Sequence, residues 1–170
     1  QDAGHHGNLF LSSYSSVDHQ YLTVSIMISV LYVDDERDLL EVTKLFLEMG
    51  GDIKVTTMLS AKEALEQDIG SFDAVVSDYL MPGMDGIVFL KAVRQRSGDI
   101  PFILFTGRGR EEVVIEAINN GADSYLQKGA DPNAQFAELA HRIRQAVKRR
   151  HAEQSLQESE KRLADIQLSP

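Results

Sequence analysis

Cysteine is absent from the 170 residues, so the chain has no disulfides, thiolate metal ligands or cysteine nucleophiles. Long hydrophobic runs are absent too, because no apolar stretch reaches the roughly 18 residues that a membrane-spanning helix needs. The first Lys or Arg is Arg37, so the N-terminal part lacks the positively charged segment of a signal peptide. We therefore expect a cytoplasmic protein that does not enter the membrane.

Basic residues are fewer than acidic residues. The chain has 17 Lys and Arg against 26 Asp and Glu, which gives a net charge of -9, and its pI is near 5.0. This balance argues against a broad nucleic-acid-binding surface, so nucleic acid is not an expected partner. The length and a hydrophobic content of 43% are typical of one globular domain with extensions.

The first 26 residues differ in composition from the rest. They are rich in Ser, His and Gly and have no sustained helical or strand periodicity. We interpret residues 1–26 as an N-terminal extension, residues 27–150 as the folded domain and residues 151–170 as a helical linker or the start of a coiled coil. The adjacent His5 and His6 are expected to be solvated rather than to bind a metal.

From Ile28 onward, short β-branched runs alternate with longer amphipathic segments. This alternation predicts five βα units, and therefore an α/β fold with a doubly wound parallel sheet of five strands. Ser60 and Asp85 are each predicted to cap the helix that follows, with Glu63 completing a capping box. The expected strands are 28–33, 52–59, 72–77, 100–105 and 124–127, and the expected helices are 36–50, 61–68, 84–96, 111–120 and a long one from 132 or 133.

The last predicted helix is unusually long. Residues 135–167 contain neither Gly nor Pro and consist largely of strong helix formers. Its first half carries apolar residues at helical spacing, which suits packing on a sheet, whereas its second half has only Leu156, Leu163 and Ile166 among charged residues. Two interpretations stay open for the second half, a short coiled coil that could form a homodimer and a solvated helix.

Chemically reactive side chains follow four of the predicted strands. Asp34 and Asp35 come after the first strand, Asp78 after the third, Thr106 after the fourth and Lys128 after the fifth. Because ligands of a parallel sheet gather at the carboxyl ends of its strands, we expect these side chains to converge.

Such a cluster of carboxylates needs a cation. Ligands that offer only oxygen select a hard ion, and Mg²⁺ held by Asp34, Asp35 and Asp78 is the natural choice. With the ion screening its charge, Asp78 could attack phosphorus as a nucleophile. Lys128 and the Thr106 hydroxyl would then contact oxygens of the phosphoryl group.

Over residues 27–150 the chain resembles the receiver domains of response regulators in two-component signalling. The resemblance is carried by "VDDE" after the first strand, "SDYLMPGMDG" after the third, "FTG" after the fourth and "YLQK" at the fifth. It implies a (βα)5 fold with sheet order 2-1-3-4-5. It also implies that Asp34 and Asp35 bind Mg²⁺, and that Asp78 accepts a phosphoryl group from a histidine kinase or phosphotransfer protein.

The resemblance further implies a switch. Thr106 and Lys128 would contact the phosphoryl group, and Tyr125 would report phosphorylation together with Thr106 through the face built by the fourth helix, fifth strand and fifth helix. The tail from Arg149 resembles helical linkers that join receivers to PAS or kinase modules. One departure is Gly129, which follows Lys128 where the family usually has proline.

Two other functions compete with the signalling phosphoacceptor. A phosphatase of the haloacid-dehalogenase type also uses an aspartate nucleophile and Mg²⁺, but it would need a D-x-D motif after the first strand, where this chain has Asp34-Asp35. A receiver that only binds partners would typically lack one of the acids, the threonine or the lysine. We therefore expect a phosphoacceptor rather than a turnover enzyme.

Overall fold

The computed structural model describes residues 26–107, 111–129 and 131–167, and residues 1–25 of the expected extension, with His5 and His6, lie outside this part. Five parallel strands form one sheet in the order β2-β1-β3-β4-β5, which confirms the predicted α/β fold. The strands are β1 (Ile28–Val33), β2 (Ile53–Met58), β3 (Ala74–Ser77), β4 (Phe102–Thr106) and β5 (Ser124–Gln127). The helices are α1 (Arg37–Glu48), α2 (Ala61–Leu65), α3 (Gly86–Ser97), α4 (Glu111–Asn119) and α5 (Pro132–Gln167), with a short 3-10 helix η1 (Ile69–Ser71) that the sequence did not predict.

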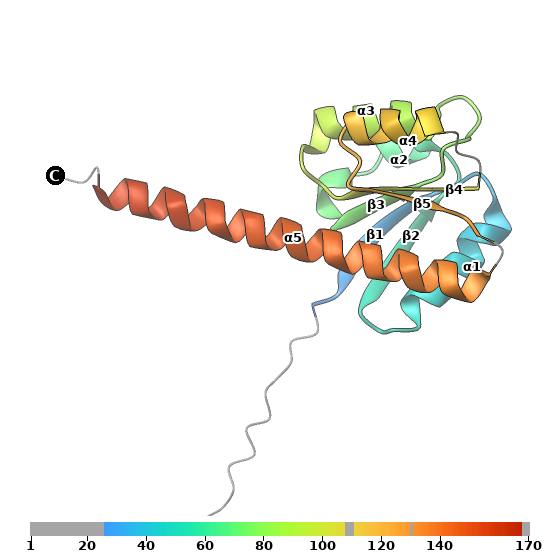
Figure 1. Ribbon diagram of the computed structural model, residues 1–170, viewed down its shortest axis with the longest axis horizontal. Helices are drawn as coiled ribbons and strands as arrows, with labels where there is room; N and C mark the ends of the chain where they lie inside the picture. Colours follow the sequence, from blue (N-terminus) through green and yellow to red (C-terminus); the bar gives the residue numbers. More distant parts are fainter. Residues whose placement is uncertain (1–25, 108–110, 130, 168–170) are drawn as a thin grey trace, which may run out of the picture.

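Helices cover both faces of the sheet. Helices α2, α3 and α4 lie on one face, and α1 and α5 lie on the other (Figure 1). The side chains of β1 alternate between the two cores: Leu31 and Val33 pack toward the first group of helices, and Val30 and Tyr32 toward the second. Burial on both faces explains why β1, β3 and β4 are nearly continuous apolar runs that end abruptly in polar residues.

Two predicted helix caps are present. The Ser60 hydroxyl accepts a hydrogen bond from the Glu63 amide at 3.2 Å. The Asp85 carboxylate accepts from the amides of Ile87 and Val88, both at 2.9 Å, so it stabilises the start of α3.

The sequence of 36–50 predicts a broad apolar face for α1 that includes Leu39, Leu40, Thr43, Leu45, Phe46 and Leu47, and this face is too broad. Leu45 was assigned to it but is 68% exposed, whereas Leu40, Thr43 and Leu47 are buried. Residues 45 and 47 lie about 200° apart around a helix, so they cannot both face the same core.

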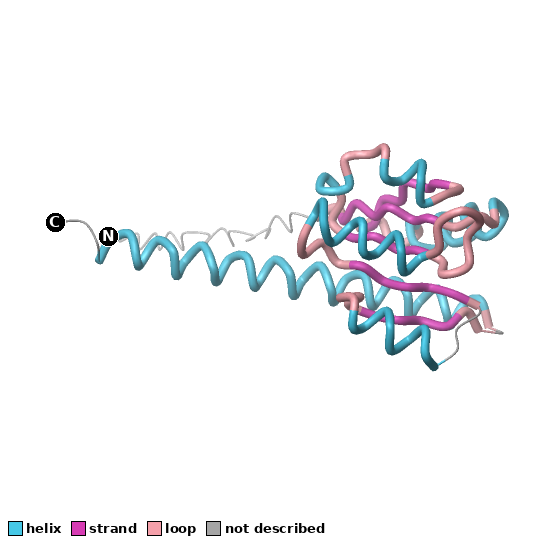
Figure 2. Tube along the Cα trace, turned by 90° about the horizontal axis from the view of Figure 1, so that it is seen from above, coloured by secondary structure: helices cyan, strands magenta, loops and turns pink. Residues whose placement is uncertain are grey.

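Helix α5 is 36 residues long and extends well beyond the domain (Figure 2). Its buried residues, among them Phe136, Leu139, Ile143 and Val147, all lie in its first half, as predicted. Leu156, Leu163 and Ile166 in the second half are exposed. Neither α5 nor any other helix in the described ranges combines the length and apolarity that a membrane span requires.

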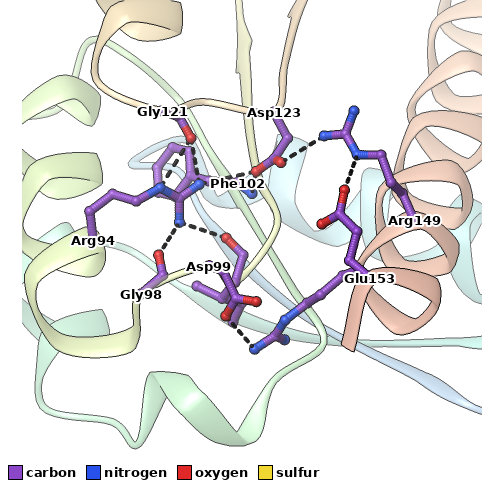
Figure 3. Close-up of polar contacts among 10 residues, drawn as sticks. Arg94, Gly98, Asp99, Phe102, Gly121, Asp123, Arg149 and Glu153 are labelled. Carbon is purple, nitrogen blue, oxygen red and sulfur yellow. Dashed lines mark hydrogen bonds and ion pairs between the residues drawn. The ribbon is translucent and has the colours of Figure 1, made fainter. Parts of the chain in front are cut away.

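A network of charged side chains fixes α5 where it leaves the domain (Figure 3). Arg94 of α3 donates to the Gly121 carbonyl and pairs with Asp123 at 3.0 Å. Asp123 also pairs with Arg149 of α5 at 3.1 Å, and the neighbouring Arg150 pairs with Asp99. The network therefore ties α5 to α3 and to the segments preceding β4 and β5, at the end of the sheet opposite the strand tips.

Candidate functional site

Three of the predicted functional residues, Asp34, Asp78 and Lys128, continue the hydrogen-bonding ladder of the sheet by one residue. The Asp34 amide donates to the Met58 carbonyl at 3.1 Å, and the Asp78 amide donates to Val33 at 2.9 Å. In the same way the Lys128 amide donates to the Thr106 carbonyl at 2.9 Å. Because their backbones are fixed by the sheet, these side chains are held on rigid elements rather than on loops.

Asp34 is fully buried, and both of its carboxylate oxygens accept hydrogen bonds. Its Oδ2 accepts from Lys128 Nζ at 2.8 Å and from the Tyr32 hydroxyl at 3.0 Å. Its Oδ1 accepts from the Glu36 amide at 2.9 Å. A buried carboxylate is costly unless it is paired and hydrogen-bonded, and here three donors meet that requirement.

Asp78 is nearly as buried as Asp34, but one of its carboxylate oxygens lacks a hydrogen bond in the described part of the chain. Its Oδ1 has no hydrogen-bond partner among the described residues, and Lys128 Nζ lies 3.6 Å away. Burial raises the pKa of Asp78, and the charge of Asp34 adds to this rise, whereas a hydrogen bond from Thr106 and the charge of Lys128 oppose it. Asp78 is therefore a carboxylate whose ionised form is poorly stabilised in the ion-free protein.

Asp35 completes an acidic cluster. Oxygen atoms of Asp34, Asp35 and Asp78 all lie within 4.8 Å of one another, and Asp35 is the exposed member. Three carboxylates at this spacing and one buried oxygen without a hydrogen bond fit a hard divalent cation such as Mg²⁺.

An open hollow of about 320 Å³ lies over the cluster. Acidic, hydroxyl and ammonium groups line it together, so it offers both ligands for a cation and donors for an anion. Its lining includes Asp35, Glu36, Asp78, Thr106, Gly107 and Lys128.

The loop after Asp78 turns sharply away from the hollow. Gly83 has φ of +81°, which favours glycine, and the Gly86 amide donates to the Tyr79 carbonyl at 2.8 Å. A Cβ at Gly86 would lie 2.3 Å from the Asp78 carbonyl oxygen. Gly86 therefore permits α3 to begin directly against the strand end.

The structure brings together all five residues predicted at the strand ends, Asp34, Asp35, Asp78, Thr106 and Lys128. Tyr125 lies two residues before the end of β5, where its ring is partly buried against the core beneath α2, α3 and α4. The peptide bonds of the described residues are all trans, and the Gly129 amide donates to the Gln135 side chain at 2.7 Å.

Sequence reasoning missed Tyr32. It lies two residues before Asp34, so the alternation of the strand places both side chains on one face of the sheet. Burial, and then the charge of Asp34 and the hydrogen bond to it, raise the pKa of Tyr32. The available signal was a phenol among β1 side chains that are otherwise apolar where they are buried, immediately before a predicted ligand.

Comparison with known proteins identifies the same family that the sequence motifs resemble. The family model of the response regulator receiver domain matches residues 30–143. Response regulator SaeR of Staphylococcus aureus is 36% identical over 123 residues, which cover 72% of this chain and 52% of that protein. The chain thus matches about half the length of this curated relative.

Solved structures agree with the sequence match. A receiver domain from Clostridium thermocellum has a TM-score of 0.67 and 29% identity, with coverage of 74% of this chain and 98% of that one. The receiver domain of a Francisella response regulator has a TM-score of 0.64 and 32% identity, covering 72% and 98%. The chemotaxis protein CheY4 of Vibrio cholerae has a TM-score of 0.62 and 29% identity, covering 69% and 98%.

Proposed function

This chain belongs to the response regulator receiver domain family, and we propose that its Asp78 carboxylate accepts a phosphoryl group from a phosphohistidine. The donor would be a histidine kinase or a phosphotransfer protein. The observation that carries the proposal is Asp78 Oδ1, a buried oxygen without a hydrogen bond in the described part of the chain, on a residue that lines a hollow shared with Thr106 and Lys128.

In the transfer, Asp78 forms a bond to phosphorus while the bond between phosphorus and the imidazole nitrogen breaks. The imidazole nitrogen keeps the electron pair of that bond, and the ring leaves as neutral imidazole when its other nitrogen carries a proton. Asp78 attacks as a carboxylate that is already ionised, so it needs no general base. Lys128 Nζ, 2.8 Å from Asp34 and 3.6 Å from Asp78, is near enough to neutralise a phosphoryl oxygen. The Thr106 hydroxyl at the end of β4 would donate to a second oxygen.

We propose that Asp34, Asp35 and Asp78 hold Mg²⁺ for this reaction. The fit rests on their oxygen atoms, which lie within 4.8 Å of one another. A bound Mg²⁺ would supply charge screening between the carboxylates and the phosphate oxygens. Asp34 and Asp35 would orient the ion from β1, and Asp78 would keep one oxygen for phosphorus.

Phosphorylation is proposed to act as a switch rather than as a turnover reaction. Drawing Thr106 toward the phosphoryl group would free space beside β5, which the ring of Tyr125 could then enter. The face formed by α4, β5 and α5 would change shape, and partner proteins would read that change.

The acceptor is tested with radiolabelled acetyl phosphate and Mg²⁺. The wild-type chain should incorporate phosphate, and Asp78→Asn should not. Phosphate incorporated by Asp78→Asn at the wild-type level would exclude Asp78 as the acceptor. If neither protein is labelled, and beryllofluoride with Mg²⁺ causes no chemical-shift change in the wild type, the chain is a receiver that only binds partners.

The exposed half of α5 is proposed to pair with a second copy of the chain as a helical linker toward a PAS or kinase module. Leu156, Leu163 and Ile166 repeat at seven- and three-residue spacing, as a and d positions do, and all three are exposed. In this register Glu153 and Glu160 occupy e positions, and Lys148 and Arg162 occupy g positions.

These charges favour a parallel pair. A parallel arrangement sets Lys148 opposite Glu153 of the second copy, whereas an antiparallel one sets acids against acids and bases against bases. Sedimentation velocity should detect a dimer that Leu163→Glu dissociates. A wild-type chain that stays monomeric at the highest soluble concentration would refute this pairing.

A further inference from the structure

Tyr32 is the one phenol that contacts the acidic cluster in the described residues. Its hydroxyl donates to Asp34 Oδ2 at 3.0 Å, and its side chain is fully buried in the core between the sheet and helices α1 and α5. A phenylalanine would fill nearly the same volume in this core. Packing therefore explains the ring but not the hydroxyl.

Tyr32 and Lys128 both donate to Oδ2 of Asp34, and their side chains differ in conformational freedom. Lys128 reaches Oδ2 from the end of β5 with a flexible side chain that also lies 3.6 Å from Asp78. Tyr32 reaches it from within β1, with its ring packed beside Phe105 at a centroid distance of 6.4 Å. The Lys128 ammonium also lies over the Phe105 ring, 5.7 Å from its centroid, but only the tyrosine is fully enclosed by the core.

This difference matters when a divalent ion binds, because its positive charge repels the Lys128 ammonium, and it matters further once a phosphoryl group is present. In the proposed function Lys128 turns toward a phosphoryl oxygen, which weakens its bond to Asp34. Asp34 then keeps the Glu36 amide on Oδ1 and the Tyr32 hydroxyl on Oδ2. Two fixed donors on opposite oxygens suffice to define the orientation of the carboxylate.

We propose that Tyr32 is a positioning residue that holds Asp34 in the orientation needed to bind the divalent ion. The inference rests on the proposed function in taking Asp34 as an ion ligand. Hydrogen bonds to ligating carboxylates orient them, and loss of such a partner typically lowers metal affinity about 10- to 100-fold. The hydroxyl thus contributes to ion binding without touching the ion.

The test compares Tyr32→Phe with the wild-type chain in two measurements. Calorimetric titration with Mg²⁺, without any phosphate donor, should give an affinity about tenfold weaker in the variant. In labelling with acetyl phosphate, the Mg²⁺ concentration for half-maximal rate should rise by the same factor. The rate at saturating Mg²⁺ should stay within about twofold, because excess ion compensates for the lost orientation.

Tyr79→Phe is the matched control. It removes the same atom from a tyrosine next to Asp78, but this ring packs toward the opposite core and has no hydrogen bond to the acidic cluster in the described residues. Its Mg²⁺ affinity should equal that of the wild type. Circular dichroism melting of both variants verifies that they fold.

Two results would overturn the inference. One is a folded Tyr32→Phe that binds Mg²⁺ as tightly as the wild type, or more tightly. The other is a lower rate at saturating Mg²⁺ with an unchanged Mg²⁺ dependence, which would make Tyr32 a packing residue. Failure of the proposed function is separate, because labelled Asp78→Asn would exclude the acceptor while leaving the calorimetric comparison of Tyr32 valid.

Discussion

Replacing Asp78 with asparagine should stabilise the ion-free protein. Asp78 is 5% exposed, and burial is the largest cause of its raised pKa. Asparagine has nearly the same shape and carries no charge. The substitution therefore removes the cost of holding an ionised group in this environment, at the expense of the proposed activity.

The magnitude follows from four opposing effects. At an effective dielectric constant of about 20, charges 4.8 Å apart, the outer limit for Asp34 and Asp78, repel by about 3.5 kcal/mol. Lys128 at 3.6 Å attracts Asp78 by about 4.6 kcal/mol on the same scale. These two effects nearly cancel, which leaves desolvation opposed by the hydrogen bond from Thr106, so we expect a gain of about 1–3 kcal/mol for the asparagine variant.

Urea unfolding in EDTA at neutral pH, followed by circular dichroism, measures this gain. The midpoint should rise while the slope stays constant, and each kcal/mol should raise the melting temperature by about 3–4 °C in a domain of this size. Asp35→Asn is the control, because that carboxylate is exposed and its loss removes no desolvation cost. Excess Mg²⁺ should reverse the order by stabilising the wild type more than Asp78→Asn.

The pH dependence has a definite sign. A carboxyl whose pKa is raised by folding contributes stability in its protonated form, fully present below its unfolded pKa and lost as the pH rises through the folded pKa. The advantage of Asp78→Asn should therefore shrink as the pH falls. An asparagine variant no more stable than the wild type in EDTA at neutral pH would refute the reasoning.

Two further substitutions test the framework around the site by urea unfolding. Gly86→Ala should cost about 3 kcal/mol, because its Cβ would lie 2.3 Å from the Asp78 carbonyl, whereas Gly129→Ala, with no atom within 4 Å, should cost far less. Asp52→Asn should cost about 0.5–1 kcal/mol at neutral pH, since Arg144 donates to both Asp52 oxygens and lowers the pKa of Asp52. This loss of stability should decrease as the pH falls through the Asp52 pKa. A difference in unfolding free energy between Asp52→Asn and the wild type that does not change at acidic pH would contradict the prediction.

The strands and the positions of the site residues could be read from the sequence for a physical reason. Ionised side chains are rare within a strand that is buried on both faces, so Asp34 and Asp78 mark the ends of β1 and β3. Thr106 is the last residue of β4, and Lys128 directly follows β5. Because parallel strands share one carboxyl edge, the sequence positions already imply proximity in space.

The sequence did not reveal which groups each side chain contacts. Tyr32 fits the apolar pattern of β1, and only the structure reveals that its hydroxyl reaches Asp34. Leu45 fits the composition of a core-facing helix, but the angular position of each residue depends on where α1 packs. The network of Arg94, Asp123 and Arg149 joins segments far apart in the chain, and no local pattern encodes that pairing.

The site lies at one end of the sheet and is poorly stabilised, whereas the long helix is fixed at the other end by ion pairs. At the strand tip, Asp78 is held by rigid backbone although burial makes its charge poorly stabilised, which suits a site that gains stability when an ion or a phosphoryl group arrives. At the other end of the sheet, Arg149 and Arg150 fasten α5 through Asp123 and Asp99. Because α5 packs on β3, β4 and β5 between these ends, the proposed rearrangement of Thr106 and Tyr125 would occur in the two strands that support the helix.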